Sequence, residues 1–177
     1  MMLSDAIMYA VLVDASPLIY LAKLDALDVF AGSGHQPLVT AEVERETARA
    51  GLAYDHPDAM TIAEALRDGA LHRTTISDRE RAVAQRLGAE AGGLDIGESE
   101  VLAAAQARRL PVVIFERRAT RLARSMGLET WSPVRLLIAG TADAGLRRDR
   151  IIRFGRLVAM RYEDVEALIR WIEGRKP

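Results

Sequence analysis

Cysteine is absent from this chain, which excludes disulfide bonds, thiolate zinc sites and cysteine nucleophiles. The three histidines are scattered and lack the spacing of a metal site. Aromatic residues make up only 5% of the sequence, so we interpret them as packing residues rather than as platforms for base stacking. No apolar run approaches the length of a membrane span, and the first residues lack a basic leader and a small-residue cleavage site. We therefore expect a soluble, cytoplasmic protein that makes no use of a membrane.

The chain does contain an uneven distribution of charge. Half of its 177 residues are apolar, enough to bury a full core as one domain with a helical appendage. The net charge is only -1, yet residues 1–98 hold 16 acidic and 8 basic side chains, whereas residues 99–177 hold 9 acidic and 16 basic ones. All but two of the basic residues are Arg, the side chain best suited to bidentate phosphate contact. The basic half fits nucleic-acid binding, although solvated helix faces also carry Arg.

The segment MYAVLVDASPLIYL, residues 8–21, is the most informative stretch. Tyr9–Val13 is rich in β-formers and ends abruptly at Asp14, as expected of a buried parallel strand. Ser16 as N-cap and Pro17 at the first helical position predict a helix directly afterwards. Asp14 is thereby placed at the carboxyl end of a strand, where open α/β sheets bind ligands. The alternative is that Asp14 only helps to cap the helix.

The rest of the chain alternates between predicted strands and helices. Ser77 and Glu80 form a capping-box signal, and Pro111–Phe115 (PVVIF) has the uninterrupted apolar character of a buried parallel strand. This alternation predicts an α/β fold, a three-layer α/β/α sandwich around a central parallel sheet. Further strands are expected near residues 37–39, 71–76 and 128–131, and further helices over 41–50, 58–67, 77–88, 95–109, 118–126 and 133–139. The last segment, residues 141–177, carries apolar residues at helical spacing and is expected to pack as one or two helices against the domain or a partner subunit.

Four carboxylates fall at element ends or on a helix face: Asp14, Glu46, Glu98 and Glu116. Converging carboxylates repel one another and need a cation, and hard divalent ions such as Mg²⁺ or Mn²⁺ prefer oxygen ligands. Such an ion can activate water while neutralising a phosphodiester's developing charge. Each acid also has a structural interpretation. Asp95 and Glu98 are spaced as a capping box, and Glu46 can pair with Arg49 along its helix.

Taken together, the order and spacing of these motifs resemble the PIN domain, a metal-dependent nuclease fold. The matching stretches are VLVDASPLIYLAKL (11–24), LVTAEVERE (38–46), LDIGESEVLAAAQARRLPVVIFERRATRLARSMGL (94–128) and SPVRLL (132–137). The stretch GESEVL resembles the corresponding motif in a prokaryotic branch of PIN proteins that is related to VapC-type toxins. The resemblance implies that Asp14, Glu46 and Glu98 serve one or two Mg²⁺ or Mn²⁺ ions during RNA hydrolysis.

The sequence departs from the family's pattern at the fourth acid. Where related chains have an Asp directly after the apolar strand, this chain has Phe115 followed by Glu116. Glu116 replaces the missing acid only if the backbone has already turned, because adjacent strand residues point to opposite faces. We assign Asp14, Glu46, Glu98 and Glu116 as catalytic candidates, and Asp14, Glu98 and Glu116 as metal ligands. Candidate nucleic-acid contacts are Ser16, Arg117, Arg118 and Arg121.

The sequence therefore predicts a PIN-like domain over residues 1–140, followed by a C-terminal helical extension over 141–177. The expected function is a divalent-metal-dependent ribonuclease of the kind that serves as the toxin of a toxin–antitoxin pair. Its expected partners are RNA, an antitoxin protein and a second copy of the chain in a homodimer. Two alternatives stay open: a catalytically degenerate PIN-like module that binds nucleic acid or a protein, and an unrelated doubly wound domain with an acidic pocket.

Overall fold

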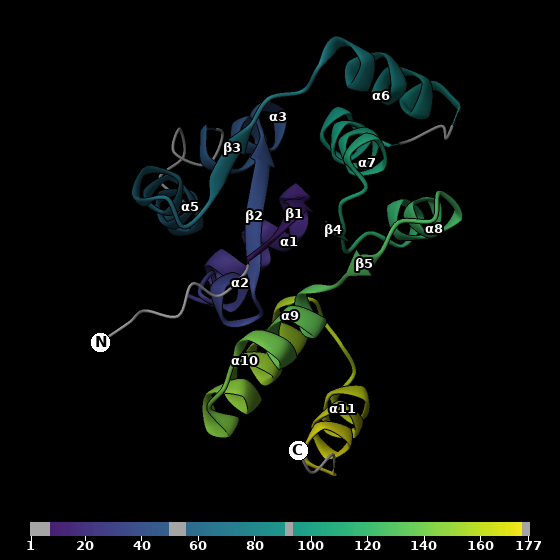
Figure 1. The fold of residues 1–177 in the computed structure, drawn as a ribbon. Coiled ribbons are helices and arrows are strands. Elements are labelled where there is room, and N and C mark those ends of the chain that lie inside the picture. Colours follow the sequence, from purple (N-terminus) through teal and green to yellow (C-terminus); the bar gives the residue numbers. More distant parts are fainter. Residues whose placement is uncertain (1–7, 50–55, 91–93, 175–177) are drawn as a thin grey trace.

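The computed structural model describes residues 8–49, 56–90 and 94–174. Its centre is a five-stranded, all-parallel sheet in the order β3-β2-β1-β4-β5 (Figure 1). The strands are β1 (Tyr9–Val13), β2 (His35–Thr40), β3 (His72–Thr74), β4 (Val112–Val113) and β5 (Thr130–Trp131). The expected α/β architecture with a parallel sheet is confirmed.

Helices connect the strands and flank the sheet in Figure 1. They are α1 (Ala15–Lys23), α2 (Val29–Gly32), α3 (Ala41–Glu44), the π-helix η1 (Arg45–Arg49), α5 (Pro57–Asp68), α6 (Asp78–Glu90), α7 (Ile96–Arg108), α8 (Arg117–Ser125), α9 (Pro133–Gly140), α10 (Ala144–Leu157) and α11 (Tyr162–Gly174). None of the helices within the described ranges combines the length and the apolar character that a bilayer crossing would require.

The central strand β1 is covered on both faces. Val11, Leu12 and Val13 are consecutive, so their side chains alternate between the two faces of the sheet, and each is 0% exposed. β1 pairs with β2 on one side and with β4 on the other. The chain builds outward from β1 to β2 and β3, and then crosses over to add β4 and β5. The carboxyl ends of β1 and β4 therefore mark the topological switch point, the place where such sheets bind ligands.

The C-terminal helices pack onto the sheet domain through α9 and through buried side chains of α10. Helix α10 lies against α9, and α11 lies against α10 (Figure 1). Phe154 of α10 is buried in the main core, and an added Cβ on Gly155 would lie 2.5 Å from Cγ2 of Val165 on α11. The glycine thus permits close contact between the two helices. The helical prediction for this segment is confirmed, while its separation at residue 140 stays a prediction.

Two expected element boundaries are wrong near the proposed site. Helix α1 begins at Ala15 with Asp14 as N-cap residue, so Ser16 lies inside the first turn and is not the cap. Strand β4 contains only Val112–Val113, because the backbone leaves the sheet before Phe115. Glu116 therefore lies outside the strand, at the N-cap position of α8, so the alternation of side chains along a strand does not decide where it points.

A third correction concerns the helix expected over residues 41–50. Thr40 caps it by accepting a hydrogen bond from Val43 N–H at 3.2 Å, but after one α-helical turn the chain widens into the π-helix η1. Its expected end at residue 50 lies outside the described residues. The expected capping box at Ser77 and Glu80 is confirmed, with hydrogen bonds in both directions.

Candidate metal centre

Asp14 stands at the end of the central strand and is almost completely buried, with 2% exposure. Its backbone N–H donates to the carbonyl of Val113 at 3.0 Å, which ties the residue to the end of β4. Although Asp14 holds the N-cap position of α1, its side chain accepts no capping hydrogen bond. The backbone group that favours its charged form is the N–H of Ala15, the first residue of α1.

Glu46 reaches the first turn of α7 from the π-helix η1. An added Cβ on Gly97 would lie 2.9 Å from Oε2 and 3.1 Å from Oε1 of Glu46. The carboxylate thus occupies the space that any side chain at position 97 would fill. This contact explains why glycine suits position 97, and it brings an acid from the second strand–helix unit to the beginning of α7.

Glu98 is held in place by the capping box at the beginning of α7. Its backbone N–H donates to Oδ1 of Asp95 at 2.7 Å, and its side-chain Oε2 accepts from the Asp95 N–H at 3.2 Å. The structural interpretation of this pair is therefore correct. It does not exclude a role for the acid, because Glu98 is 8% exposed and its charge interacts with Asp14.

Burial and neighbouring charges raise the pKa values of these acids. The pKa of Asp14 is raised to about 7, first by burial and then by the charges of Glu98, Asp95 and Glu46, whereas the Ala15 N–H opposes the increase. Burial also raises the pKa of Glu46 to about 7, with the charges of Asp95 and Glu42 adding to the effect and Arg45 opposing it. The pKa of Glu98 is raised by burial first, then by Asp95 and Glu116. Asp14 is thus within electrostatic range of both Glu46 and Glu98, while their role as one metal site stays a prediction.

Glu116 and Phe115 occupy the end of β4 in different ways. Glu116 is exposed at the N-cap position of α8, close enough to Glu98 that its charge raises the pKa of that acid. The Phe115 ring is half-buried and meets Tyr20 and Phe154 edge to face, with centroid distances of 5.3 and 5.7 Å. Phe115 therefore packs in an aromatic cluster. At this strand end, Glu116 is the acid whose charge acts on Glu98.

The expected nucleic-acid contacts divide between two elements. Arg117, Arg118 and Arg121 are exposed on α8, and the charge of Arg118 lowers the pKa of Glu98, so this helix runs beside the carboxylates. Ser16 is half-buried in the first turn of α1, two residues after Asp14. An RNA-binding role for these four residues stays a prediction.

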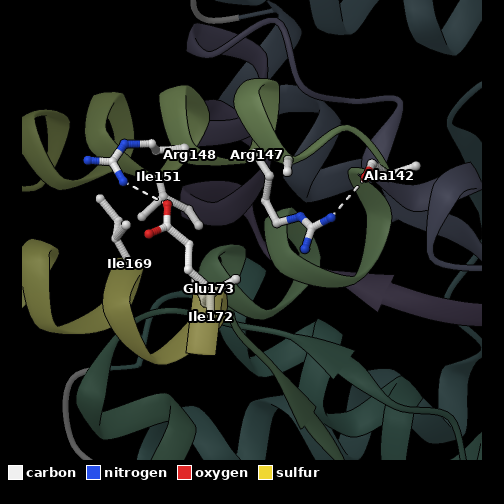
Figure 2. A pocket seen from close by; sticks show the side chains of 8 residues that line it. Ala142, Arg147, Arg148, Ile151, Ile169, Ile172 and Glu173 are labelled. Carbon is white, nitrogen blue, oxygen red and sulfur yellow. Dashed lines mark hydrogen bonds and ion pairs between the residues drawn. The ribbon is translucent and has the colours of Figure 1, made fainter. Parts of the chain in front are cut away.

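A cavity of about 580 Å³ lies between α10 and α11, away from the carboxylates (Figure 2). Its charged groups are already paired: Arg148 binds Glu173 at 2.7 Å, and Arg147 donates to the carbonyls of Thr141 and Ala142. Isoleucine side chains form much of its lining. Asp14, by contrast, is a buried acid with other acids nearby whose like charges raise its pKa. We therefore regard the carboxylates as the stronger candidate for a catalytic site.

Comparison with known proteins assigns the fold to a family. The family model described as PIN domain matches residues 10–147. The chain belongs to the PIN-domain family. No curated protein matches it significantly. The matched range contains Asp14, Glu46, Glu98 and Glu116, and the PIN domain is a nuclease-type fold whose members typically depend on a metal.

The donor set of this PIN domain fits a hard divalent cation. The candidate ligands are all carboxylates, and the burial that mainly raises their pKa values disfavours their charged forms unless a cation compensates them. Across residues 8–49, 56–90 and 94–174, no three acids or histidines are already spaced as a complete ligand set. Mg²⁺ does not require one, because it keeps several waters and commonly takes one or two carboxylates together with substrate phosphate.

Sequence reasoning missed one member of the acidic site. Asp95 was interpreted only as half of a capping box, yet its charge raises the pKa values of Asp14, Glu46 and Glu98. Asp95 is exposed, at the mouth of the site. The signal available in the sequence was its position just before the Gly97-Glu98 pair, because a helix N-terminus that receives one acid also favours others nearby.

Proposed function

We propose that this PIN domain is a divalent-metal-dependent endoribonuclease that uses Mg²⁺ or Mn²⁺. The observation that carries the proposal is the burial of Asp14 at the switch point of the sheet, among Glu46, Asp95 and Glu98. Folding brings these acids together against their mutual repulsion. A bound divalent cation would compensate that charge.

Within this proposal, Asp14, Glu98 and Glu116 hold the ion, and Glu46 orients water at the site. The bound metal supplies an activated water and neutralises charge that develops on the phosphodiester. Glu98 is positioned for this role by its capping box, which fixes the side chain relative to the helix axis. Gly97 leaves room for the Glu46 carboxylate beside it.

The Arg residues of α8 provide the corresponding phosphate-binding surface. Arg117, Arg118 and Arg121 are exposed, and Arg118 is close enough to Glu98 to lower its pKa. An RNA strand along this helix would thus place a phosphate near the carboxylates while its neighbours contact guanidinium groups. Such binding should weaken steeply as salt concentration rises.

The proposal is tested by RNA cleavage and by metal binding measured on the same variants. The wild type should cleave a mixed RNA pool weakly with Mn²⁺ or Mg²⁺ and not with EDTA. Asp14→Ala should lower the rate at least about 100-fold, equivalent to about 2.7 kcal/mol. Glu98→Gln should reduce it less, and this variant keeps an acceptor for the capping bond while removing the charge.

Calorimetric Mn²⁺ titration separates metal loss from misfolding. Asp14→Ala should lose measurable binding, whereas Glu64→Gln, an exposed change on α5, should bind Mn²⁺ and cleave RNA as the wild type does. Cleavage that persists in Asp14→Ala would show that another site or a contaminant is responsible. Mn²⁺ binding that is equal in all variants would refute the assignment of ligands.

A second function is favoured by the position of Phe115. This residue stands where the sequence resemblance implies an Asp, and its ring is engaged with Tyr20 and Phe154. A site with one ligand fewer suits a degenerate PIN domain that binds nucleic acid or a protein without cleaving. Complete absence of cleavage by the wild type, together with retained RNA binding by α8, would favour this function over the nuclease.

The resemblance to VapC-type toxins adds a proposal about a partner. We propose that an antitoxin protein restrains the nuclease and that the domain forms a homodimer. Co-purification of the chain with the product of an adjacent gene, and loss of RNA cleavage in that complex, would support the toxin function. Sedimentation of a monomer at high protein concentration would refute the homodimer.

A further inference from the structure

A cavity of about 290 Å³ lies between α6 and α7, beside the carboxylate site. Helix α6 contributes Arg81 and Gly88 to its lining, and the first turns of α7 contribute Asp95, Ser99 and Glu100. Asp95 belongs to both places: it lines this cavity, and its charge raises the pKa values of Asp14 and Glu46. The cavity therefore opens next to the point where we place the scissile phosphate.

The cavity contains a polar atom that the protein leaves unsatisfied. Ser99 is 3% exposed. Its Oγ is buried and has no hydrogen-bond partner among the described residues. Burying a hydroxyl without a partner costs about 1–3 kcal/mol. A molecule bound in the cavity would supply the missing hydrogen bond, so this hydroxyl points to a guest.

The remaining lining combines one buried carboxylate with apolar walls. Glu100 is 7% exposed and has Arg81 NH1 at 3.5 Å from its Oε1. Ile96, at the rim, is 65% exposed although it is a large apolar residue. Apolar side chains and a buried carboxylate that can accept hydrogen bonds are features of pockets that read the edge of an unstacked base.

We propose that this cavity binds a guanine base of the RNA substrate, adjacent to the phosphate at the metal site. Guanine presents two neighbouring N–H donors, at N1 and N2, which match the two oxygens of the Glu100 carboxylate. Such two-point pairing with a charged acceptor is strong and specific. Adenine, cytosine and uracil each present a single donor position on that edge, and Arg81 is available to donate to guanine O6. The proposal rests on the proposed ribonuclease function for its biological role, but binding of the base needs no metal.

The test uses guanosine 5′-monophosphate and the full chain in EDTA, followed by amide chemical shifts in ¹H–¹⁵N spectra. Shifts should concentrate on α6 and the beginning of α7, with affinity at least about tenfold above that for the adenosine, cytidine and uridine monophosphates. Inosine 5′-monophosphate, which lacks the N2 amino group, should bind more weakly than the guanosine nucleotide. Glu100→Gln should lose the preference for guanine.

Gly88 offers a matched pair of variants that separates blocking from unfolding. An added Cβ there would lie 3.5 Å from Ser99 Oγ, which is an ordinary contact, and alanine favours the helix more than glycine does. Gly88→Ala should keep most of the binding. Gly88→Leu extends into the cavity and should abolish it, while its far-ultraviolet circular dichroism stays that of a folded protein.

The outcomes distinguish this inference from the proposed function. No binding of the guanosine nucleotide, equal binding of all four nucleotides, or binding unchanged in Gly88→Leu would overturn it and leave the cavity as a water site. Guanine-selective binding by a protein that cleaves no RNA would support the pocket and refute the nuclease. Metal-dependent cleavage without any base preference would support the nuclease and refute the pocket.

Discussion

Replacing Asp14 by Asn should stabilise the protein at alkaline pH, because the native carboxylate is charged there in a buried acidic site. Folding raises its pKa from 3.8 to about 7. Between these values the folded state keeps a proton that the unfolded state has released, so the free energy of unfolding falls as pH rises through this window. The difference of about three units corresponds to about 4 kcal/mol at full extent. Local relaxation and water entry lower this figure, so we expect about 2–4 kcal/mol.

The assay is urea denaturation of wild type and Asp14→Asn in EDTA at pH 4, 6 and 8.5. The two proteins should be equally stable at pH 4, where Asp14 is protonated in the folded state, and the variant should be more stable at pH 8.5. A gain of 2–4 kcal/mol corresponds to a melting temperature about 4–16 °C higher for a chain of this size. Mn²⁺ should stabilise the wild type and not the variant, because only the carboxylate gains from the cation.

The control is Asp149→Asn, an exposed acid on α10 whose nearest basic partner is Arg153 at 3.8 Å. Surface pairs of this kind contribute little, so its stability should differ from that of the wild type by less than about 0.5 kcal/mol at every pH. An Asp14→Asn variant that is no more stable than the wild type at pH 8.5 would refute the reasoning. It would mean that the carboxylate is already compensated without a metal.

Two further changes test the geometry around this acid. Gly97→Ala should leave the stability nearly unchanged but lower metal affinity and RNA cleavage. The new Cβ would lie 2.9 Å from Oε2 of Glu46 and would displace the flexible end of that side chain. Calorimetric Mn²⁺ titration and a cleavage assay measure the two effects, and unchanged values of both would contradict the role of Glu46. Phe115→Asp should destabilise the fold by about 2–4 kcal/mol in urea denaturation, since it removes a half-buried ring from contact with Tyr20 and Phe154, and Phe115→Leu should cost less. An Asp at position 115 that costs no stability and raises cleavage would instead show that the position is free to serve the metal site.

The features that the sequence predicted best depend on local contacts. The strand at Tyr9–Val13 and the acid after it follow from an apolar run and a helix start that lie within a few residues of each other. The capping boxes at Ser77 and Asp95 are likewise reciprocal bonds across three residues. Because these signals involve neighbours in the chain, periodicity and residue type suffice to locate them.

The features that were missed depend on contacts between distant segments. The widening of the helix into η1 at Arg45–Arg49 changes the direction in which Glu46 points, and nothing in its residue pattern separates a π-helix from an α-helix. The approach of Glu46 to Gly97 joins residues from different strand–helix units. The prediction that the helix begins after Ser16 was wrong. Asp14 and Ser16 are both good N-cap residues, and the end of β1 at Val13 places Asp14 in that position.

Phe115 links the altered site to the C-terminal helices. One of the two rings that it contacts, Tyr20, lies inside the range matched by the PIN-domain family, whereas the other, Phe154 on α10, lies beyond residue 147, where that match ends. The ring at position 115 therefore serves a packing contact with a part of the chain that the family match does not include. An Asp in its place would bring a charge to the edge of this aromatic cluster, which burial disfavours. Position 115 is thus committed to packing against α10, and Glu116, at the N-cap position of α8 with its charge acting on Glu98, is the acid that we propose for the fourth place in the site.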